Sequence, residues 1–434
     1  MGLSIIEIRM HIFGKCNEYV QKIVKVMILK ILYVVSLFPC WSETFIVREM
    51  LALKRRGVDV VIFSLKQPEE KTVQSDVAFL ADSVIYPVGL LKATKRNFNF
   101  LVSNFGVIFK LLLDITVSMY KTPIAGIKSI IVMWRTLGAL PDILKQDISW
   151  IHAHWATYPS TSAMVMSKII KIPFSFTAHA HDIFEENQLL NQKYNAATFG
   201  VTISKYNKEY LSRKLHRPFG GELNIIHCGV DLSVMPYTRS GRDLNNILAV
   251  GRLDEIKGFK YLIEACSVLK ANNISFKCKI VGDGPLKAEL VKMRDDFGLQ
   301  QDVEFLGVLK QEEVRNILAR ATMFVLPSVK TSTGNMDGIP VALMEAMATG
   351  LPVISTYVSG IPELIEDGVS GYLCEPKNSK ELAEKITLLV SDSELQEEFS
   401  KSARLKVERQ FSIELEADKL LQLFSEGMQS CAKN

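Results

Sequence analysis

Two His-x-His pairs are the first residues in this 434-residue sequence whose types and spacing suggest chemistry. HAHW covers positions 152 to 155, and TAHAHDIF covers positions 177 to 184 after the apolar segment IPFSF. Imidazole is a frequent ligand of zinc and of other borderline-soft cations. A metal-dependent hydrolase that holds its ion through both pairs is therefore one hypothesis.

The residues around the pairs argue against that hydrolase. Hydrolases of the metallo-β-lactamase type need a His-x-His-x-Asp-His run, whereas here Asp182 follows His181 directly. In the first pair, strand alternation sends His152 and His154 to one face, where packing against a helix is the more common fate. We expect this first pair to lie in the core or in a polar network.

A second group of residues suggests an anion site. The segment DGIPVALMEAMATG, residues 337–350, follows the apolar run MFVLP and a polar loop. Pro340 suits a first helical turn, so the helix should begin there, and unpaired amides at a helix N-terminus bind anions such as phosphate. The residues expected to form this site are Gly338, Val341, Ala342 and Leu343.

Two acids flank the expected anion site. Helical side chains lean toward the N-terminus, so the Glu345 carboxylate can reach hydroxyl groups of the same ligand. Asp337 precedes the helix on the other side. An acid, a row of amides and a second acid suit a sugar, a diphosphate and a ribose in sequence. The alternative is that Asp337 only caps the helix and Glu345 lies on a solvated face.

Two cations follow another apolar run, NILAV. In VGRLDEIKGFKYL, residues 250–262, Arg252 and Lys257 should lie at the carboxyl edge of a sheet. There they would neutralise a diphosphate and stabilise it as it leaves. Surface salt bridges with Asp254 and Glu255 are the alternative.

A glycine-containing turn comes next, in VGDGPLKAEL, with Gly282 and Gly284. It lacks the third glycine of a dinucleotide-binding fingerprint. The chemistry of a tight strand-to-helix turn explains it equally well.

Alternating apolar runs and helical spacings must position these groups. ILYVVSLF (31–38), FIVREMLALKRRG (45–57) and VDVVIFSL (58–65) read as strand, helix and strand. The alternation includes a helical insert at about 91–140 and restarts after a linker near 233–246. Because the chain exceeds what one core supports, we expect two α/β domains with a ligand cleft between them.

The order and spacing of several motifs resemble the retaining glycosyltransferases of family 4. In the second half these are GRLDEIKG, VGDGP, VEFLG, an acid followed after seven residues by Glu, GLPVIST and SGIPELIEDGVSGYL. In the first half, PCWSETFIVREMLALKRRG, HAHWATYPSTSAM, SFTAHAHDIF, TISKYNKEYL and IIHCGVDL resemble the exopolysaccharide branch, including colanic-acid-type enzymes. The resemblance covers nearly the whole chain after residue 26.

The resemblance implies the GT-B fold, an α/β architecture of two Rossmann-like doubly wound domains that face each other across a cleft. We expect an acceptor-side domain at 27–235, with the insert within it, and a nucleotide-sugar-binding domain at 243–410. Residues 411–434 should return to the first domain as a helix. Residues 1–26 form an extension with too many charges for a signal peptide, and Met27 could be the true start.

Functional roles follow from the resemblance position by position. Arg252 and Lys257 would hold the donor diphosphate, and Glu345 would bind the ribose hydroxyls. His179 matches a family histidine that faces the donor sugar, and Asp337 would touch that sugar, so these two are the expected catalytic residues. The family more often has Glu at the position of Asp337, and this departure of one methylene leaves the identity of the donor sugar open.

The remaining site residues are expected on both sides of the cleft. The other donor-side residues are Gly282, Gly284, Val308, Gly338, Ile339, Val341, Ala342 and Leu343. The acceptor-side residues are Ser42, Glu43 and Thr44, with helix capping by Ser42 as the alternative.

The expected chemistry needs neither a metal nor another cofactor. No D-x-D pair is present to hold Mn²⁺ or Mg²⁺ against a diphosphate. The resemblance implies that the leaving phosphate accepts the proton of the acceptor. The expected donor is a UDP- or GDP-linked sugar, and the acceptor is a lipid-linked or oligosaccharide glycan. A binding protein that keeps the fold without turnover is a further alternative.

Charge and hydropathy bear on location. A net charge of +4 is too mild to indicate nucleic acid, and seven cysteines without a C-x-x-C spacing fit a cytoplasmic protein. Segment 98–120 could span a membrane by length, but Lys110 and Asp114 would then cost about 2.5 to 3.5 kcal/mol each. Residues 91–135 hold seven basic residues and one acid. Their helices therefore either touch the inner membrane peripherally or pack as core helices with solvated lysine tips.

Overall fold

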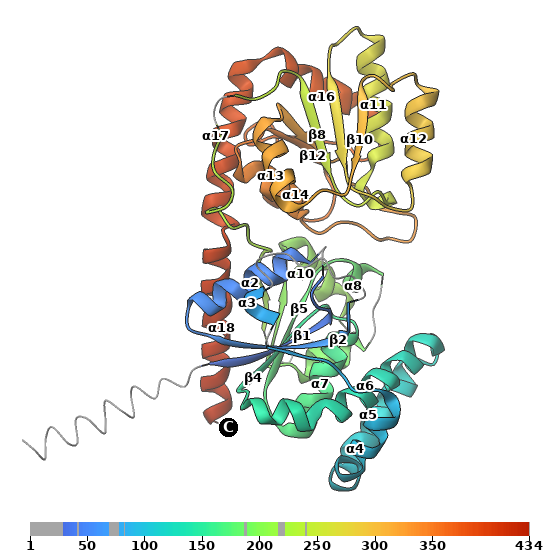
Figure 1. Ribbon diagram of the computed structural model, residues 1–434, viewed down its shortest axis with the longest axis vertical. Coiled ribbons are helices and arrows are strands. Elements are labelled where there is room, and N and C mark those ends of the chain that lie inside the picture. Colours follow the sequence, from blue (N-terminus) through green and yellow to red (C-terminus); the bar gives the residue numbers. More distant parts are fainter. Residues whose placement is uncertain are drawn as a thin grey trace, which may run out of the picture.

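The computed structural model describes residues 29–40, 43–68, 78–81, 83–185, 189–215, 222–238 and 241–433. The expected extension 1–26, the alternative start Met27 and the acceptor-side candidate Ser42 lie outside these residues. Within them, two α/β domains lie one above the other, and long helices run along one side of both (Figure 1).

The N-terminal domain is built on a seven-stranded sheet in the order β3-β2-β1-β4-β5-β6-β7, with every neighbouring pair parallel. Five consecutive residues of one interior strand, from Ile31 to Val35, are buried, as expected when helices cover both faces of a parallel sheet. The strands are β1 (Lys30–Leu37), β2 (Asp59–Lys66), β3 (Val84–Ile85), β4 (Trp150–His154), β5 (Phe174–Ala178), β6 (Phe199–Thr202) and β7 (Glu222–Ile225). The helices that connect them, apart from the insert, are α2 (Thr44–Arg55), α3 (Ala78–Ala81), α7 (Tyr158–Ile170), α8 (His181–Phe184), α9 (Leu190–Ala196) and α10 (Lys205–Lys214).

Between β3 and β4 the insert forms three helices, α4 (Leu90–Ser103), α5 (Phe105–Ser118) and α6 (Pro123–Ile143), followed by the 3-10 turn Leu144–Gln146. They project from the domain on the side away from the C-terminal domain (Figure 1). Segment 98–120 is not one helix, because the chain breaks at Asn104. Among the described residues, one helix, 123–146, is long and apolar enough to cross a membrane, and 44% of its most apolar window is buried within the protein.

The C-terminal domain has a six-stranded parallel sheet in the order β10-β9-β8-β11-β12-β13. The chain runs outward from β8 to β10 and restarts on the other side with β11, so the switch point lies between β8 and β11, where open α/β sheets bind ligands. The strands are β8 (Asn246–Val250), β9 (Lys277–Val281), β10 (Val303–Gly307), β11 (Met323–Val325), β12 (Val353–Thr356) and β13 (Tyr372–Cys374). The helices are α11 (Phe259–Ala271), α12 (Lys287–Asp296), α13 (Gln311–Arg320), α14 (Val341–Ala348), α15 (Ile361–Leu364) and α16 (Ser379–Ser391), with a 3-10 turn at Glu255–Lys257.

The last two helices connect the domains. α17 (Ser393–Gln410) packs in the C-terminal domain, and α18 (Ile413–Lys433) continues along the N-terminal domain (Figure 1). Leu420 and Phe424 of α18 are fully buried in one cluster with Trp150 and Phe199 of the N-terminal sheet. The chain thus ends on the domain in which it begins.

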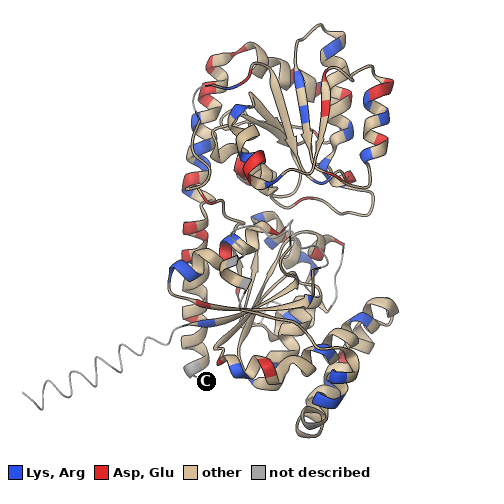
Figure 2. Cartoon of the chain, viewed as in Figure 1, with Lys and Arg blue, Asp and Glu red and all other residues tan. Residues whose placement is uncertain are grey.

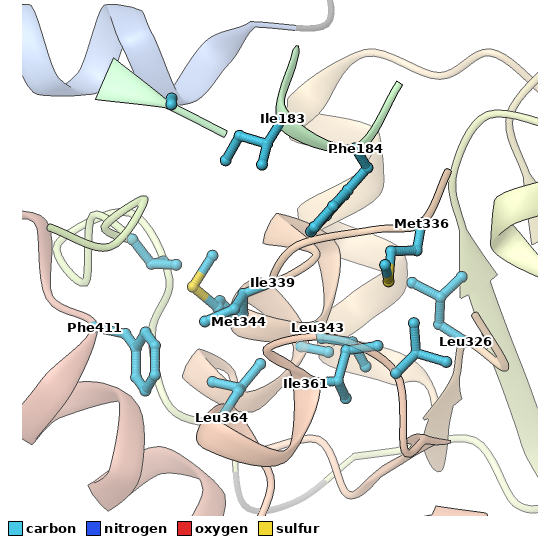
Figure 3. Packing of buried hydrophobic residues seen from close by; sticks show 14 of the residues in the cluster. Ile183, Phe184, Leu326, Met336, Ile339, Leu343, Met344, Ile361, Leu364 and Phe411 are labelled. Atoms are coloured by element: carbon cyan, nitrogen blue, oxygen red, sulfur yellow. The ribbon is translucent and has the colours of Figure 1, made fainter. Parts of the chain in front are cut away.

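Apolar packing is continuous between the domains. Ile183 and Phe184 of α8 belong to the same buried cluster as Ile339 and Met344 (Figure 3). The two sheets meet across loops that follow the carboxyl ends of their strands. The prediction of an α/β fold with two doubly wound domains is confirmed.

Candidate functional site

A cavity of about 380 Å³ lies between the two domains. Two residues of α2, Thr44 and Arg48, line it from the N-terminal domain. The C-terminal domain contributes the ends of β8 and β9, the segment after β10, and parts of α13 and α14. Six predicted donor-side residues line this cavity together, namely Arg252, Gly282, Val308, Val341, Ala342 and Glu345.

The N-terminus of α14 forms one wall of the cavity. Pro340 is the N-cap residue, and the helix begins at Val341. Val341 and Ala342 line the cavity where helical amides lack an intrahelical acceptor, which favours an anion there. The amide of Leu343 donates to the Pro340 carbonyl at 3.1 Å, so the prediction that this amide is free is wrong. Gly338 and Ile339 are buried at the domain contact and do not line the cavity.

Glu345 is bound by an arginine from the other domain. Nη2 of Arg48 lies 2.6 Å from Oε1 of Glu345, and the two side chains are only 11% and 14% exposed. Nη1 of Arg48 is buried and has no hydrogen-bond partner. The carboxylate expected to bind a ribose therefore carries a counter-charge from α2.

Lys257 and Asp337 also form a pair. Nζ of Lys257 lies 2.7 Å from Oδ1 of Asp337, and the Ser328 hydroxyl donates to Oδ2 at 2.8 Å. Neither Lys257 nor Asp337 is among the residues that line the cavity. Arg252 does line it, with a side chain that is 72% exposed and 3.9 Å from Asp254. Arg252 is thus the more accessible of the two predicted cations.

Gly282 and Gly284 permit a close contact between two loops. Gly282 has φ +138°, and a Cβ atom there would lie 1.9 Å from the carbonyl oxygen of Gly251. A Cβ atom at Gly284 would lie 2.5 Å from the carbonyl oxygen of Leu253. Both glycines are required by the tight approach of the β9 loop to the β8 loop, and Gly282 alone of the pair lines the cavity.

His179 belongs to a buried chain of hydrogen bonds. Its Nε2 is 3.1 Å from Nδ1 of His154, whose Nε2 is 3.0 Å from Oε1 of Glu49. The hydroxyl of Tyr33 donates to the same Glu49 oxygen at 2.8 Å. His179 is 4% exposed, its ring lies against the tilted ring of Trp155, and it is not among the residues that line the cavity.

The direction of these bonds follows from the ionisation of Glu49. Burial alone would raise the pKa of Glu49, but the neighbouring His154, His152 and Tyr33 lower it below its usual value. An ionised carboxylate only accepts hydrogen bonds, so Nε2 of His154 donates to it. In neutral imidazoles Nδ1 of His154 then accepts from Nε2 of His179. Burial also lowers the pKa of His179, which favours the neutral ring.

His152 belongs to the same polar network, as expected for the first His-x-His pair. Its Nδ1 lies 2.8 Å from the Ser175 hydroxyl, and its Nε2 lies 3.1 Å from the Thr177 hydroxyl. Ligand atoms of Glu49, His152 and His154 lie within 4.8 Å of one another, a spacing that a metal ion could use. The hydrogen bonds named above already satisfy both nitrogens of His152, so these side chains need no ion to explain their burial.

The two histidines of the second His-x-His pair, His179 and His181, lie in different environments. His181 begins α8 and its side chain is 50% exposed, with Nδ1 3.0 Å from Glu185. Asp182 is buried and accepts from the backbone amides of Ala156 and His179. Asp182 therefore fixes the loop that carries His179.

Of the residues expected on the acceptor side, Glu43 is the N-cap residue of α2, without a side-chain capping bond. Its Oε1 accepts a hydrogen bond from the Trp155 indole at 3.0 Å. Burial raises the pKa of Glu43 to about 7, although His154 and Trp155 act in the opposite direction. A carboxyl group that titrates near neutral pH beside a cleft is a frequent feature of functional sites.

Sequence reasoning missed Arg48 and Glu49. The available signal was an adjacent pair of charges within the otherwise apolar helix FIVREMLAL, one turn after the loop PCWSETF. Such a pair on a helix that follows the first strand points toward the carboxyl edge of the sheet, where ligands bind.

Comparison with known proteins adds to this geometry. A family model described as glycosyl transferases group 1 matches residues 238–406, and one described as glycosyltransferase family 4 matches residues 42–234. The chain is 29% identical over 429 residues to an amylovoran biosynthesis glycosyltransferase of Erwinia amylovora, covering 88% of this chain and 96% of the relative. It is 42% identical over 167 residues to a protein of Escherichia coli K12 named for colanic acid biosynthesis, covering 38% of this chain and 41% of the relative.

Two further similar proteins match this chain over most of their own length. An N-acetyl-alpha-D-glucosaminyl L-malate synthase of Bacillus anthracis is 32% identical over 289 residues, covering 62% of this chain and 72% of the relative. Among solved structures, Anabaena HepE in complex with UDP and glucose superposes with a TM-score of 0.66 at 17% identity, covering 92% of this chain and 100% of that one. This structural likeness supports the same two-domain fold.

Proposed function

The chain belongs to glycosyltransferase family 4, and from this premise we propose that it moves a sugar from a nucleotide-diphosphate donor to a glycan acceptor in bacterial exopolysaccharide or cell-surface polysaccharide biosynthesis. The relatives named for amylovoran and colanic acid biosynthesis support this setting. The UDP and glucose bound to HepE support a nucleotide-linked hexose as the donor, and UDP and GDP are the two nucleotides expected.

The interdomain cavity is the observation that carries the proposal. It places the cations Arg48 and Arg252, the N-terminus of α14 and the carboxylate of Glu345 around one space. A diphosphate suits the cations and the helix N-terminus, and ribose hydroxyls suit the carboxylate. Lys257, which pairs with Asp337, lies next to Gly251, a residue that lines the cavity. Cδ of Lys257 lies 3.4 Å from the position that a Cβ atom at Gly251 would take, so Lys257 adds positive charge close to the cavity.

We further propose that transfer retains the anomeric configuration and uses no metal. The bond between the anomeric carbon and the donor phosphate oxygen breaks, and a bond from the acceptor oxygen forms on the same face of the sugar. The leaving phosphate oxygen takes the acceptor proton, so atoms and charge balance without a protein nucleophile. Arg252 and the helix N-terminus would stabilise the charge that develops on the diphosphate.

Asp337 and His179 remain the predicted sugar-side residues. Both are buried. Lys257 and Ser328 hold Asp337, and His154 holds the ring of His179. Groups fixed in this way can orient a reacting sugar without a cost of reorganisation. The acceptor is proposed to be a lipid-linked glycan at the cytoplasmic face of the inner membrane.

One assay separates this proposal from the two alternatives. Purified protein is incubated with UDP- and GDP-linked sugars and a lipid-linked or oligosaccharide acceptor, with and without EDTA. We expect release of nucleoside diphosphate that depends on the acceptor and is unchanged by EDTA, and a product with the donor's anomeric configuration by NMR. Activity lost to the chelator and restored by zinc would favour the hydrolase, and binding without turnover would favour a binding protein.

A further inference from the structure

Helix α5 has two apolar faces, and only one of them is packed. Ile108, Leu111 and Ile115 are 1–2% exposed and join the core of the N-terminal domain. On the other face, large apolar side chains recur at every fourth residue and are 51–69% exposed, namely Phe105, Phe109, Leu113 and Val117. A helix that has already buried one apolar face has no internal reason to carry a second.

The exposed face continues onto the neighbouring helices. Along α4, the turn after α5 and α6, exposed apolar residues follow the same spacing of three or four. They are Phe98 (68% exposed), Val102 (69%), Tyr120 (71%), Ile124 (71%), Ile127 (59%) and Ile131 (40%). Single exposed apolar residues are ordinary on a protein surface, but a row of this length on three helices that contact one another marks an interaction surface.

The charges along this row are almost all positive. Lys92, Lys95, Lys110, Lys121 and Lys128 are exposed. Asp114 is the single acid between residues 90 and 141. Figure 2 shows the same helices, projecting from the N-terminal domain, with blue segments and little red. Apolar side chains flanked by lysines match a surface with an apolar interior and an anionic rim.

We propose that α4, α5 and the first half of α6 form a docking surface for an anionic lipid bilayer. Phe105, Phe109 and their neighbours would enter the boundary between headgroups and acyl chains, and the lysines would bind lipid phosphates. A second copy of the chain is the less suitable occupant, because a symmetric contact would place the same lysines against one another.

The helices lie on the membrane rather than cross it. The second half of α6 is fixed in the protein core by Met133, Leu137 and Leu140, all fully buried, so it cannot leave the domain to span. α4, α5 and the first half of α6 are therefore a peripheral element at the surface of the N-terminal domain. Docking of this kind deepens the proposed function, since it would bring the N-terminal domain to a lipid-linked acceptor.

The test uses the full chain and vesicles of phosphatidylcholine alone or mixed with phosphatidylglycerol. We expect co-sedimentation with the mixed vesicles that weakens as salt is raised. The variant Phe105→Ser/Phe109→Ser should lower the partition coefficient at least about tenfold, since each phenylalanine loses its apolar contact with the bilayer. Lys110→Glu/Lys121→Glu should remove the preference for anionic vesicles.

Leu244→Ser is the matched control, because Leu244 is 91% exposed and lies outside these helices. It should bind vesicles like the unmodified chain. Equal vesicle binding by the Phe105→Ser/Phe109→Ser variant, or self-association that these changes abolish in the absence of any vesicle binding, would overturn the proposal. The unmodified chain and its three variants should all bind nucleotide equally. Nucleotide binding therefore reports on the proposed transfer site, and vesicle binding reports separately on docking.

Discussion

Arg48 of the N-terminal domain and Glu345 of the C-terminal domain form a 2.6 Å ion pair across the cavity between the domains. Both side chains are largely enclosed, and Nη1 of Arg48 has no hydrogen-bond partner. An ion pair in such an enclosed site is weakly screened by solvent. The pair connects the proposed ribose-binding carboxylate to α2, so the two domains share one electrostatic site.

Arg48→Met should weaken the binding of nucleoside diphosphate by roughly tenfold, equivalent to about 1.4 kcal/mol. Without the arginine, the Glu345 carboxylate would face the diphosphate with no counter-charge, and Nη1 could no longer bind a phosphate oxygen. Titration calorimetry with UDP and GDP measures the effect. Arg55→Met, on the exposed part of the same helix and paired with Glu414, is the matched control and should bind nucleotide normally.

Tighter binding by Arg48→Met would contradict this expectation. It would mean that Arg48 only masks Glu345 until a ribose displaces it. Glu345→Ala resolves the same question from the other side, because loss of the ribose contact should weaken binding whatever the role of Arg48.

Glu49→Gln should lower kcat by roughly ten- to a hundredfold with little change in the KM for the donor. Glu49 does not line the cavity, and it acts on His179 only through His154. Loss of the carboxylate charge removes the group that fixes the His154 tautomer and therefore the orientation of the His179 ring. Steady-state kinetics across pH would show a changed profile, and Glu49→Asp should recover part of the rate.

His181→Gln provides the comparison for this network. His181 is half exposed, and its ring pairs with Glu185 rather than with the buried chain. Normal kinetics in this variant together with a loss in Glu49→Gln would separate positioning from general destabilisation. An unchanged pH profile in Glu49→Gln would show that the hydrogen-bond chain from Glu49 through His154 to His179 has no role in catalysis.

Glu43→Gln should change the dependence of stability on pH. Burial raises the pKa of Glu43 from its usual 4.5 to about 7, so the unfolded chain releases this proton at a lower pH than the folded protein does. Its contribution to stability is therefore fully present below pH 4.5 and is lost as the pH rises through 7. The difference in urea midpoint, variant minus unmodified chain, should therefore be larger at pH 8 than at pH 5. Equal differences at the two pH values would contradict this expectation.

Much of the fold followed from apolar periodicity. The strands at 30–37 and 59–66 and the helix between them lie where continuous and helical spacings predicted them. The residues at the C-terminal switch point were found because a cation or an acid that follows an apolar run must lie at the carboxyl edge of a parallel sheet. That rule predicted Arg252, the glycine turn predicted Gly282, and the lean of helical side chains predicted Glu345; all three line one cavity.

The remaining features depend on contacts between distant segments. The pairing of Arg48 with Glu345 spans 297 positions, and no local spacing encodes it. The same holds for Lys257, whose partner is Asp337 rather than the neighbouring Asp254 or Glu255 that its sequence context suggested. The first pair forms only when the two domains meet, and the second only when the C-terminal domain has folded, so a sequence read one segment at a time reveals neither.

Asp337→Asn should lower kcat by roughly a hundredfold or more while leaving the affinity for free UDP or GDP unchanged or slightly higher. The carboxylate accepts from both Lys257 and Ser328, and its removal leaves the Lys257 ammonium without its ion-pair partner. That extra positive charge favours a diphosphate, whereas the sugar loses the acid proposed to contact it. Calorimetry with the free nucleotide and kinetics with the nucleotide sugar separate the two effects. Asp337→Glu, the acid more common in the family, should keep the ion pair and most of the rate. Weaker binding of free nucleotide by Asp337→Asn would instead show that Asp337 supports the diphosphate site rather than the sugar.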